Sequence, residues 1–77
     1  MKNVQILGTG CAKCQKLAAA ATAAAQELGI EYHIEKITGV REIAQFGVAD
    51  TPALAIDGIV KVTGRVPAVA EIKKMLA

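Results

Sequence analysis

Apolar and polar positions repeat with two different periods along the chain, and the change of period predicts its elements. Residues 3–7 form a short apolar run that ends at two glycines, which is typical of a strand inside a sheet. Residues 11–28 are rich in alanine and place apolar residues at helical spacing, which predicts a long helix ended by Gly29. Residues 30–35 then alternate apolar and polar, which predicts a strand at the sheet edge with one wet face.

A shorter helix is expected after this strand. Thr38 is the expected cap, because its hydroxyl can accept a hydrogen bond from a backbone N–H of the first turn. The helix should run through Phe46 and end at Gly47. Its inward-facing residues are expected to be Val40, Ile43 and Ala44.

The last third of the chain predicts a hairpin and a final helix. Residues 53–56 and 59–62 flank Asp57-Gly58, a dipeptide that strongly favours a two-residue hairpin turn. Pro67 is a natural first residue for the helix that follows. The order is β-α-β-α-β-β-α, with a right-handed parallel strand pair first and an antiparallel hairpin added to the same sheet. This order predicts an α/β fold, a four-stranded mixed sheet flanked by three helices.

Composition limits the size and the partners of this fold. The 77 residues suffice for one domain, residues 1–77, and a chain this short buries only about 60% of its unfolded surface. Hydrophobic residues make up 53% of the chain and aromatic residues 3%, so the core must consist of Ala, Val, Ile and Leu. The nine Lys and Arg are dispersed among seven acids, so we expect no binding to nucleic acid.

No targeting or membrane segment is expected. The apolar residues 4–7 are too few for a signal peptide, which needs an apolar stretch of about 7–15 residues. The alanine run at residues 18–25 is shorter than the about 20 apolar residues that cross a bilayer. A cytoplasmic location follows, where a close cysteine pair is more often catalytic or metal-binding than a structural disulfide.

Residues 8–14 carry both cysteines of the protein. Two cysteines three positions apart share one face of a first helical turn, so Cys11 and Cys14 can interconvert between a dithiol and a disulfide. Cys11 would lie at the mouth of the helix, where unpaired N–H groups and the helix dipole favour a thiolate. A pKa lowered from about 8.5 to about 7 raises the thiolate fraction at neutral pH from about 3% to about 50%. Lys13 is either a further cation that tunes Cys11 or an ordinary surface residue.

Metal binding is the main alternative for the two cysteines. A structural zinc site wants four ligands, and His33 is the other conventional soft ligand of the chain. His33 belongs to the wet face of its strand, so we expect a solvated residue there. Two thiolates suffice for Cu(I), and small copper carriers also begin with a strand, a C-x-x-C loop and a helix. Those carriers follow the order β-α-β-β-α-β, whereas the order predicted here ends in a helix.

Three stretches carry a resemblance to a known family. They are Gly10-Cys11-Ala12-Lys13-Cys14, Thr51-Pro52-Ala53-Leu54 and Ile56-Asp57-Gly58. Together with the element order they resemble the small bacterial and archaeal thioredoxin-like redox-active disulfide proteins, a minimal thioredoxin fold. The resemblance covers essentially the whole chain. It implies that Cys11 is the attacking cysteine, Cys14 the resolving cysteine, and Pro52 a cis-proline that faces the disulfide.

The resemblance also implies an activity and partners. The protein would be a thiol-disulfide oxidoreductase that reduces protein or small-molecule disulfides, as a monomer and without an organic cofactor. A flavin-dependent thioredoxin reductase, or alternatively a glutathione-linked system, would reduce it again. The backbone of Thr51 would pair with an extended substrate segment. Without the family resemblance, Pro52 would instead be an ordinary trans proline at the start of a strand.

The sequence departs from larger thioredoxins in three ways. No Trp precedes the first cysteine, no Gly-Pro lies between the two cysteines, and the first strand offers Gln5 in place of a buried carboxylate. These departures leave the redox potential and the proton acceptor open.

Overall fold

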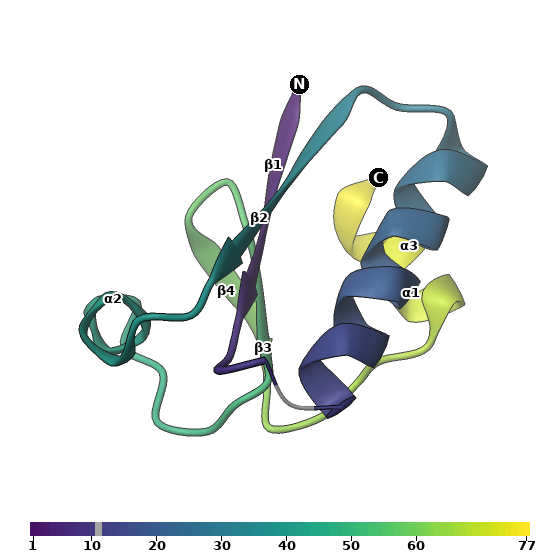
Figure 1. Ribbon diagram of the computed structural model, residues 1–77. Helices are drawn as coiled ribbons and strands as arrows, with labels where there is room; N and C mark the ends of the chain where they lie inside the picture. Colours follow the sequence, from purple (N-terminus) through teal and green to yellow (C-terminus); the bar gives the residue numbers. More distant parts are fainter. Residues whose placement is uncertain (11) are drawn as a thin grey trace.

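The computed structural model describes residues 1–10 and 12–77, and its elements follow the expected β-α-β-α-β-β-α order (Figure 1). The strands are β1 (Lys2–Leu7), β2 (Tyr32–Ile37), β3 (Ala53–Ile56) and β4 (Ile59–Thr63). The helices are α1 (Ala12–Leu28), α2 (Val40–Gln45) and α3 (Val69–Leu76). The predicted α/β fold with a four-stranded sheet and three helices is confirmed.

The sheet has the strand order β2-β1-β3-β4, so β1 lies in its interior. β1 pairs with β2 in parallel, which requires the long crossover that α1 supplies. β3 runs antiparallel to both β1 and β4. Val4 of β1, for example, lies between Ile34 of β2 and Ile56 of β3. The sheet is therefore mixed, as the sequence predicted.

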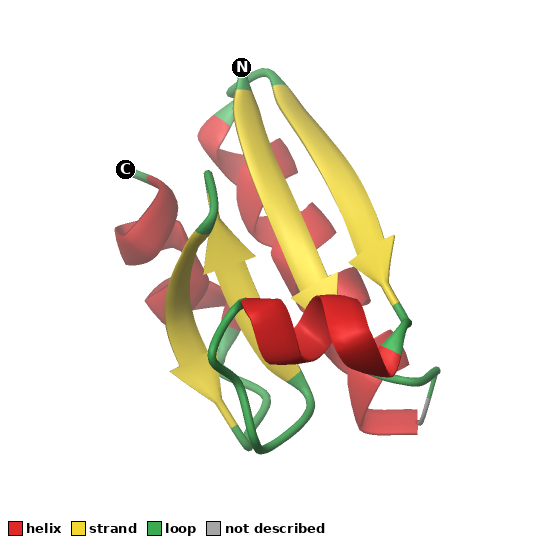
Figure 2. Cartoon of the chain, turned by 90° about the vertical axis from the view of Figure 1, so that its left-hand side faces the viewer, coloured by secondary structure: helices red, strands yellow, loops and turns green. Residues whose placement is uncertain are grey.

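Helices cover both faces of the sheet. α1 and α3 lie on one face, and α2 crosses the other (Figures 1 and 2). Because side chains alternate along a strand, Ile6 and its neighbour Leu7 enter different cores. Ile6 packs in the larger core with Leu17 of α1, and Leu7 packs in the smaller core with Ile43 of α2. The larger core also contains the fully buried residues Ala21, Ala24 and Ala25 of α1, whose small side chains let the helix lie close to the sheet.

β2 starts and ends two residues later than the sequence pattern predicted. The reason is its register with β1, where Lys2 pairs with Tyr32 and Leu7 pairs with Ile37. The alternation of half-buried and exposed residues and the edge position are as expected, and His33 is exposed. The shift brings Lys36 into the strand, close to its end.

The predicted helix starts were wrong for both later helices. The chain remains extended at Gly39, which takes the cap position of α2 without a side-chain cap, so Thr38 does not cap the helix. Of the residues expected to face inward, Ile43 is buried, but Val40 is 74% exposed and Ala44 is also exposed. Ala68 takes the cap position of α3 without a side-chain cap. The buried Pro67 precedes it and is therefore not the first residue of the helix.

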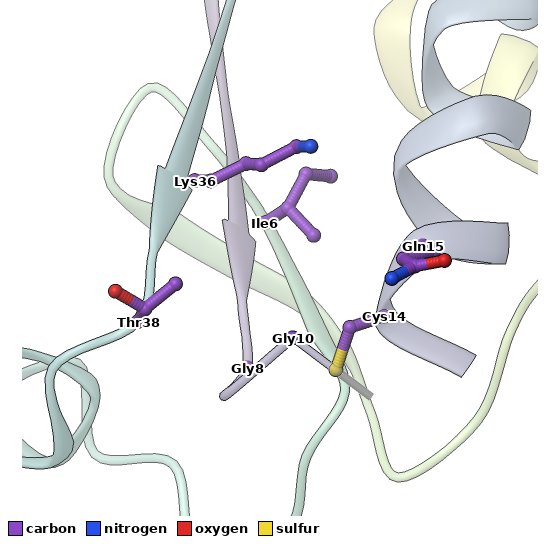
Figure 3. Close-up of a pocket in the computed structure, with 7 residues that line it drawn as sticks. All are labelled: Ile6, Gly8, Gly10, Cys14, Gln15, Lys36 and Thr38. Carbon is purple, nitrogen blue, oxygen red and sulfur yellow. The ribbon is translucent and has the colours of Figure 1, made fainter. Parts of the chain in front are cut away.

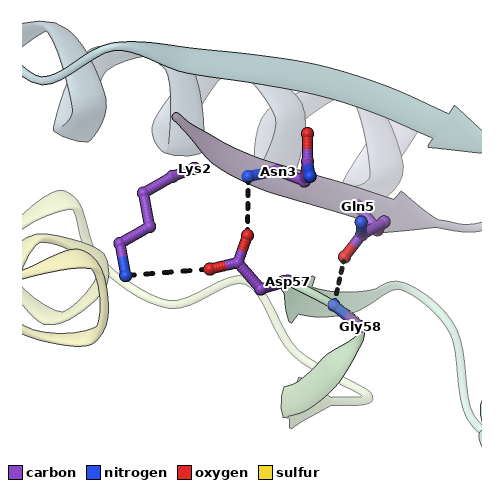
Figure 4. Close-up of polar contacts among 5 residues, drawn as sticks. All are labelled: Lys2, Asn3, Gln5, Asp57 and Gly58. Atoms are coloured by element: carbon purple, nitrogen blue, oxygen red, sulfur yellow. Dashed lines mark hydrogen bonds and ion pairs between the residues drawn. The ribbon is translucent and has the colours of Figure 1, made fainter.

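Asp57 and Gly58 form the expected hairpin turn between β3 and β4. Their φ angles are 52° and 84°, which suits a turn with two left-handed residues. The Asp57 carboxylate accepts a hydrogen bond from the N–H of Asn3 at 2.9 Å and lies 3.7 Å from the Lys2 ammonium (Figure 4). The N–H of Gly58 donates to the side-chain oxygen of Gln5 at 3.1 Å. Polar side chains thus tie the hairpin to β1.

An ion pair links the loop after β4 to α3. The Arg65 guanidinium makes two hydrogen bonds to the Glu71 carboxylate. Hydrogen bonding to Glu71 raises the pKa of Arg65, and hydrogen bonding to Arg65 lowers the pKa of Glu71. Both side chains lie in solvent, so the pair contributes little to stability.

Candidate functional site

Ends of several strands and the start of α1 lie together at the end of the sheet opposite the hairpin. β1 and β2 end there, β3 begins there, and the first turn of α1 lies nearby (Figure 2). The N–H of Gly8 donates to the carbonyl of Ile37 at 3.0 Å and so extends the pairing of β1 with β2. The N–H of Gly64 donates to the carbonyl of Pro52 at 2.9 Å, which ties the start of β3 to the end of β4.

Cys14 is buried at this end, in the first turn of α1, with 5% of its surface exposed. Its sulfur points from the helix toward the loop after β1 (Figure 3). A Cβ atom added at Gly8 would lie 2.2 Å from the Cys14 Sγ and 3.9 Å from the Cα of Pro52. Gly8 therefore leaves the space that the sulfur fills, and it brings Cys14 close to the start of β3.

Cys11 lies outside the described residues, and its pairing with Cys14 and its role as the attacking thiol remain predictions. Lys13 is exposed in the first turn of α1. Its proposed influence on Cys11 is likewise a prediction.

The Thr51-Pro52 peptide bond is cis, as the family resemblance implied. Pro52 is almost completely buried, whereas Thr51 is exposed. Thr51 is thus at the surface, next in sequence to a residue that approaches Gly8. Its pairing with a substrate segment remains a prediction.

A small cavity of about 110 Å³ opens beside Cys14 (Figure 3). It is lined by Ile6, Gly8, Gly10, Cys14, Gln15, Lys36 and Thr38. One wall comes from the ends of β1 and β2, and the other comes from α1. The side chains of Lys36 and Gln15 reach toward the gap between the two walls, and the methyl group of Thr38 points the same way.

The sequence did not identify Gly8, Gln15 or Lys36 as site residues. Gln15 directly follows Cys14, and this position next to a cysteine could have indicated that it belongs to the site. Lys36 could be placed only from the register of β2 against β1, where its partner is Ile6. Gly8 was recognised as the end of a strand, but its contact with the Cys14 sulfur depends on the packing of α1.

Gln5 was singled out because it replaces a carboxylate of larger thioredoxins. The residue is 8% exposed, and its side-chain oxygen accepts the hydrogen bond from Gly58 at the hairpin. The next residue, Ile6, lines the cavity beside Cys14. The structure therefore assigns Gln5 to the hairpin.

Within residues 1–10 and 12–77, no three His, Cys, Asp or Glu side chains are grouped so that they could hold a metal ion. In the same part of the chain, no helix has the length and apolar character needed to cross a membrane.

Known proteins are similar in sequence to this chain along nearly its whole length. A family model described as the thioredoxin domain matches residues 2–77. A protein named thioredoxin from Methanothermobacter thermautotrophicus is 47% identical over 77 residues, and the alignment covers 100% of both chains. A protein named thioredoxin from Methanocaldococcus jannaschii is 42% identical over 76 residues, which cover 99% of this chain and 87% of the relative. With its fold and the buried cysteine at the start of α1, the chain belongs to the thioredoxin domain family of thiol-disulfide oxidoreductases.

Proposed function

We propose that this protein reduces the disulfides of proteins or small molecules through Cys11 and Cys14, acting as a single domain. The observation that carries the proposal is the position of Cys14. Cys14 lies in the first turn of α1, and its sulfur fills the space beside Gly8 in the loop after β1. A buried second cysteine suits a resolving role, because it is kept from external disulfides until a mixed disulfide forms next to it.

The reaction has two thiol exchanges. The Cys11 thiolate attacks one sulfur of the substrate disulfide, and the other substrate sulfur leaves as a thiolate that takes up a proton. Cys14 then gives up its proton and attacks the Cys11 sulfur, which releases the second substrate thiol. Two electrons pass from the dithiol to the substrate, which leaves as two thiols, and the protein retains a Cys11–Cys14 disulfide.

Thr51 and Pro52 are proposed to dock the substrate. Because Thr51 is exposed at the start of β3, its backbone can pair with an extended segment next to the cysteines. Pro52 has no N–H that would compete for the same acceptor.

A second dithiol must reduce the protein again. A flavin-dependent thioredoxin reductase is the proposed reductant, and a glutathione-linked system is the alternative reductant. We further propose that the protein acts as a monomer in the cytoplasm, where thiols are kept reduced. The equilibrium potential of the cysteine pair, measured against glutathione buffers, would decide between the two reductants.

Cu(I) binding by the same cysteines is the alternative, and no observation favours it. The chain has the element order of the thioredoxin fold and ends in α3. Metal analysis after anaerobic purification tests the alternative. A tightly held, near-stoichiometric metal that survives a strong chelator would support a carrier function.

A trapping experiment tests the reductase. The protein should catalyse the reduction of insulin by dithiothreitol, followed as turbidity. Cys14→Ser should accumulate a mixed disulfide with the substrate, because the resolving step is removed, and Cys11→Ser should form none. Trapping by Cys11→Ser instead would reverse the two roles, and inactivity of the unmodified protein would refute the proposal.

A further inference from the structure

We propose that the cavity between Cys14, Lys36 and Gln15 is a subsite for the carboxylate arm of a small anionic disulfide. This inference names a substrate class and therefore rests on the proposed reductase function. It concerns a different surface from Thr51 and Pro52, which lie at the start of β3 and do not line the cavity.

The size of the cavity limits its ligand. A volume of about 110 Å³ is smaller than the roughly 150 Å³ cavity that admits benzene. It is also well below the about 300–1,000 Å³ of pockets for drug-sized ligands. The cavity can therefore enclose a short arm of a few heavy atoms, but it is too small to enclose an aromatic ring or a large cofactor.

The charge of the residues that line the cavity favours an anionic ligand. Among the described residues that line the cavity, Lys36 carries a positive charge and none is acidic. The stem of Lys36 lies over Ile6, its register partner on β1, and the ammonium extends toward α1 (Figure 3). The amide of Gln15 approaches from the helix side. An ammonium and an amide around an apolar floor suit a carboxylate that is attached to a short alkyl chain.

The position of the cavity links this arm to the reaction. Cys14 and Lys36 both line the cavity. A substrate whose carboxylate binds Lys36 would therefore place its disulfide near the cysteines. The chemistry is the exchange already described. The dithiol loses two electrons, the substrate disulfide breaks, and two carboxylate-bearing thiols leave.

Matched disulfides of different charge test the subsite. The rate constants for oxidation of the pre-reduced protein are measured with 3,3′-dithiodipropionate, which is dianionic, and with bis(2-hydroxyethyl) disulfide, which is neutral. The variants are Lys36→Gln, Lys36→Arg and Lys61→Gln. Lys61 is an exposed lysine on β4, the other edge strand, and controls for the general charge of the protein.

The ratio of the dianionic to the neutral rate constant should fall about two- to fivefold in Lys36→Gln, the range expected for an exposed ion pair. It should be retained in Lys36→Arg and in Lys61→Gln. An unchanged ratio in Lys36→Gln, or an equal fall in Lys61→Gln, would overturn the subsite. If no disulfide oxidises the protein, it is the reductase function that fails.

A second measurement decides the subsite without thiol chemistry. Suberate has the length and charge of 3,3′-dithiodipropionate but no sulfur. In a titration followed by amide chemical shifts, suberate should move the signals of Gln15 and Thr38 in the unmodified protein and much less in Lys36→Gln. Absence of these shifts, or equal shifts in the two proteins, would overturn the subsite whatever the disulfide kinetics show.

Discussion

At the hairpin end of the sheet, hydrogen bonds from polar side chains hold the β3–β4 turn to β1. At the opposite end, the buried sulfur of Cys14 packs against Gly8. Asp57 binds the backbone of Asn3, and Gln5 binds the backbone of Gly58. At the other end, Cys14 occupies the space that a side chain at Gly8 would need.

The two ends should therefore respond differently to substitution. A polar contact in which one partner is exposed can be replaced in part by water, so its loss is limited. A steric fit in a buried place has no such substitute, because neighbouring atoms must move. The end that carries Cys14 is thus the one with less tolerance for added volume.

Gly8→Ala should have the largest effect. The added methyl group overlaps the Cys14 Sγ, and overpacking of this kind costs about 1–3 kcal/mol of the free energy of unfolding. Denaturant unfolding of the reduced protein measures the loss. The same substitution in a Cys14→Ala background should cost clearly less, because the sulfur is gone.

Gly10→Ala serves as the matched control for the loop. Its φ of +89° makes alanine unfavourable, but among the residues that the structure describes, apart from its chain neighbours, none lies within 4 Å of the added Cβ. Its cost should be similar with and without the Cys14 sulfur. A cost of Gly8→Ala that is equally independent of Cys14 would contradict the steric explanation.

Gln5→Leu at the hairpin end should cost about 1–2 kcal/mol, because the partly buried N–H of Gly58 loses its acceptor. Gln45→Leu, an exposed position on α2, is the surface control and should change the stability little. The pH profile of disulfide exchange should remain the same in Gln5→Leu, since this amide serves the hairpin. A shifted pH profile would instead indicate that Gln5 takes part in proton transfer at the cysteines.

Lys13→Glu should raise the apparent pKa of Cys11, because an anion replaces a cation near the thiolate. The measurement is the rate of alkylation by iodoacetamide as a function of pH. Lys16→Glu, one turn further along the exposed side of α1, is the control. In both proteins Cys11 should react faster than the buried Cys14. An unchanged profile would make Lys13 an ordinary surface residue.

Glu71→Gln should have the smallest effect. The pKa of Glu71 is lowered in the folded protein, so its contribution to stability is present above the ordinary pKa of 4.5. It is lost as the pH falls through the lowered pKa. The stability difference between the two proteins should therefore shrink on acidification, which urea unfolding between neutral and acidic pH can follow. A difference that grows toward acidic pH would contradict this sign.

Local patterns predicted most of the fold. The alanine stripe of α1, the glycine after Leu28 and the Asp57-Gly58 turn each specify a conformation within a few residues, and all were predicted correctly. The starts of α2 and α3 were not, because the residues at the two cap positions, Gly39 and Ala68, have no polar side chain that would mark them in the sequence.

The site was predicted less completely, since its contacts join distant parts of the sequence. Helical spacing indicated that Cys14 faces the core. Lys36 lines the cavity because the register of β2 places it opposite Ile6 of β1, and Gly8 contacts the Cys14 sulfur because α1 packs on the sheet. Strand register and helix packing are contacts between distant residues, which a single sequence does not display.

The contact between Gly8 and Cys14 also makes the thiol a reporter of folding. Gly8 follows β1 and Cys14 lies in α1, so the sulfur keeps its buried position only while the helix is packed on the sheet. Its modification by a small reagent should therefore be slower in the native structure than in the unfolded chain. The ratio of the two rates would report how well the native packing protects the sulfur.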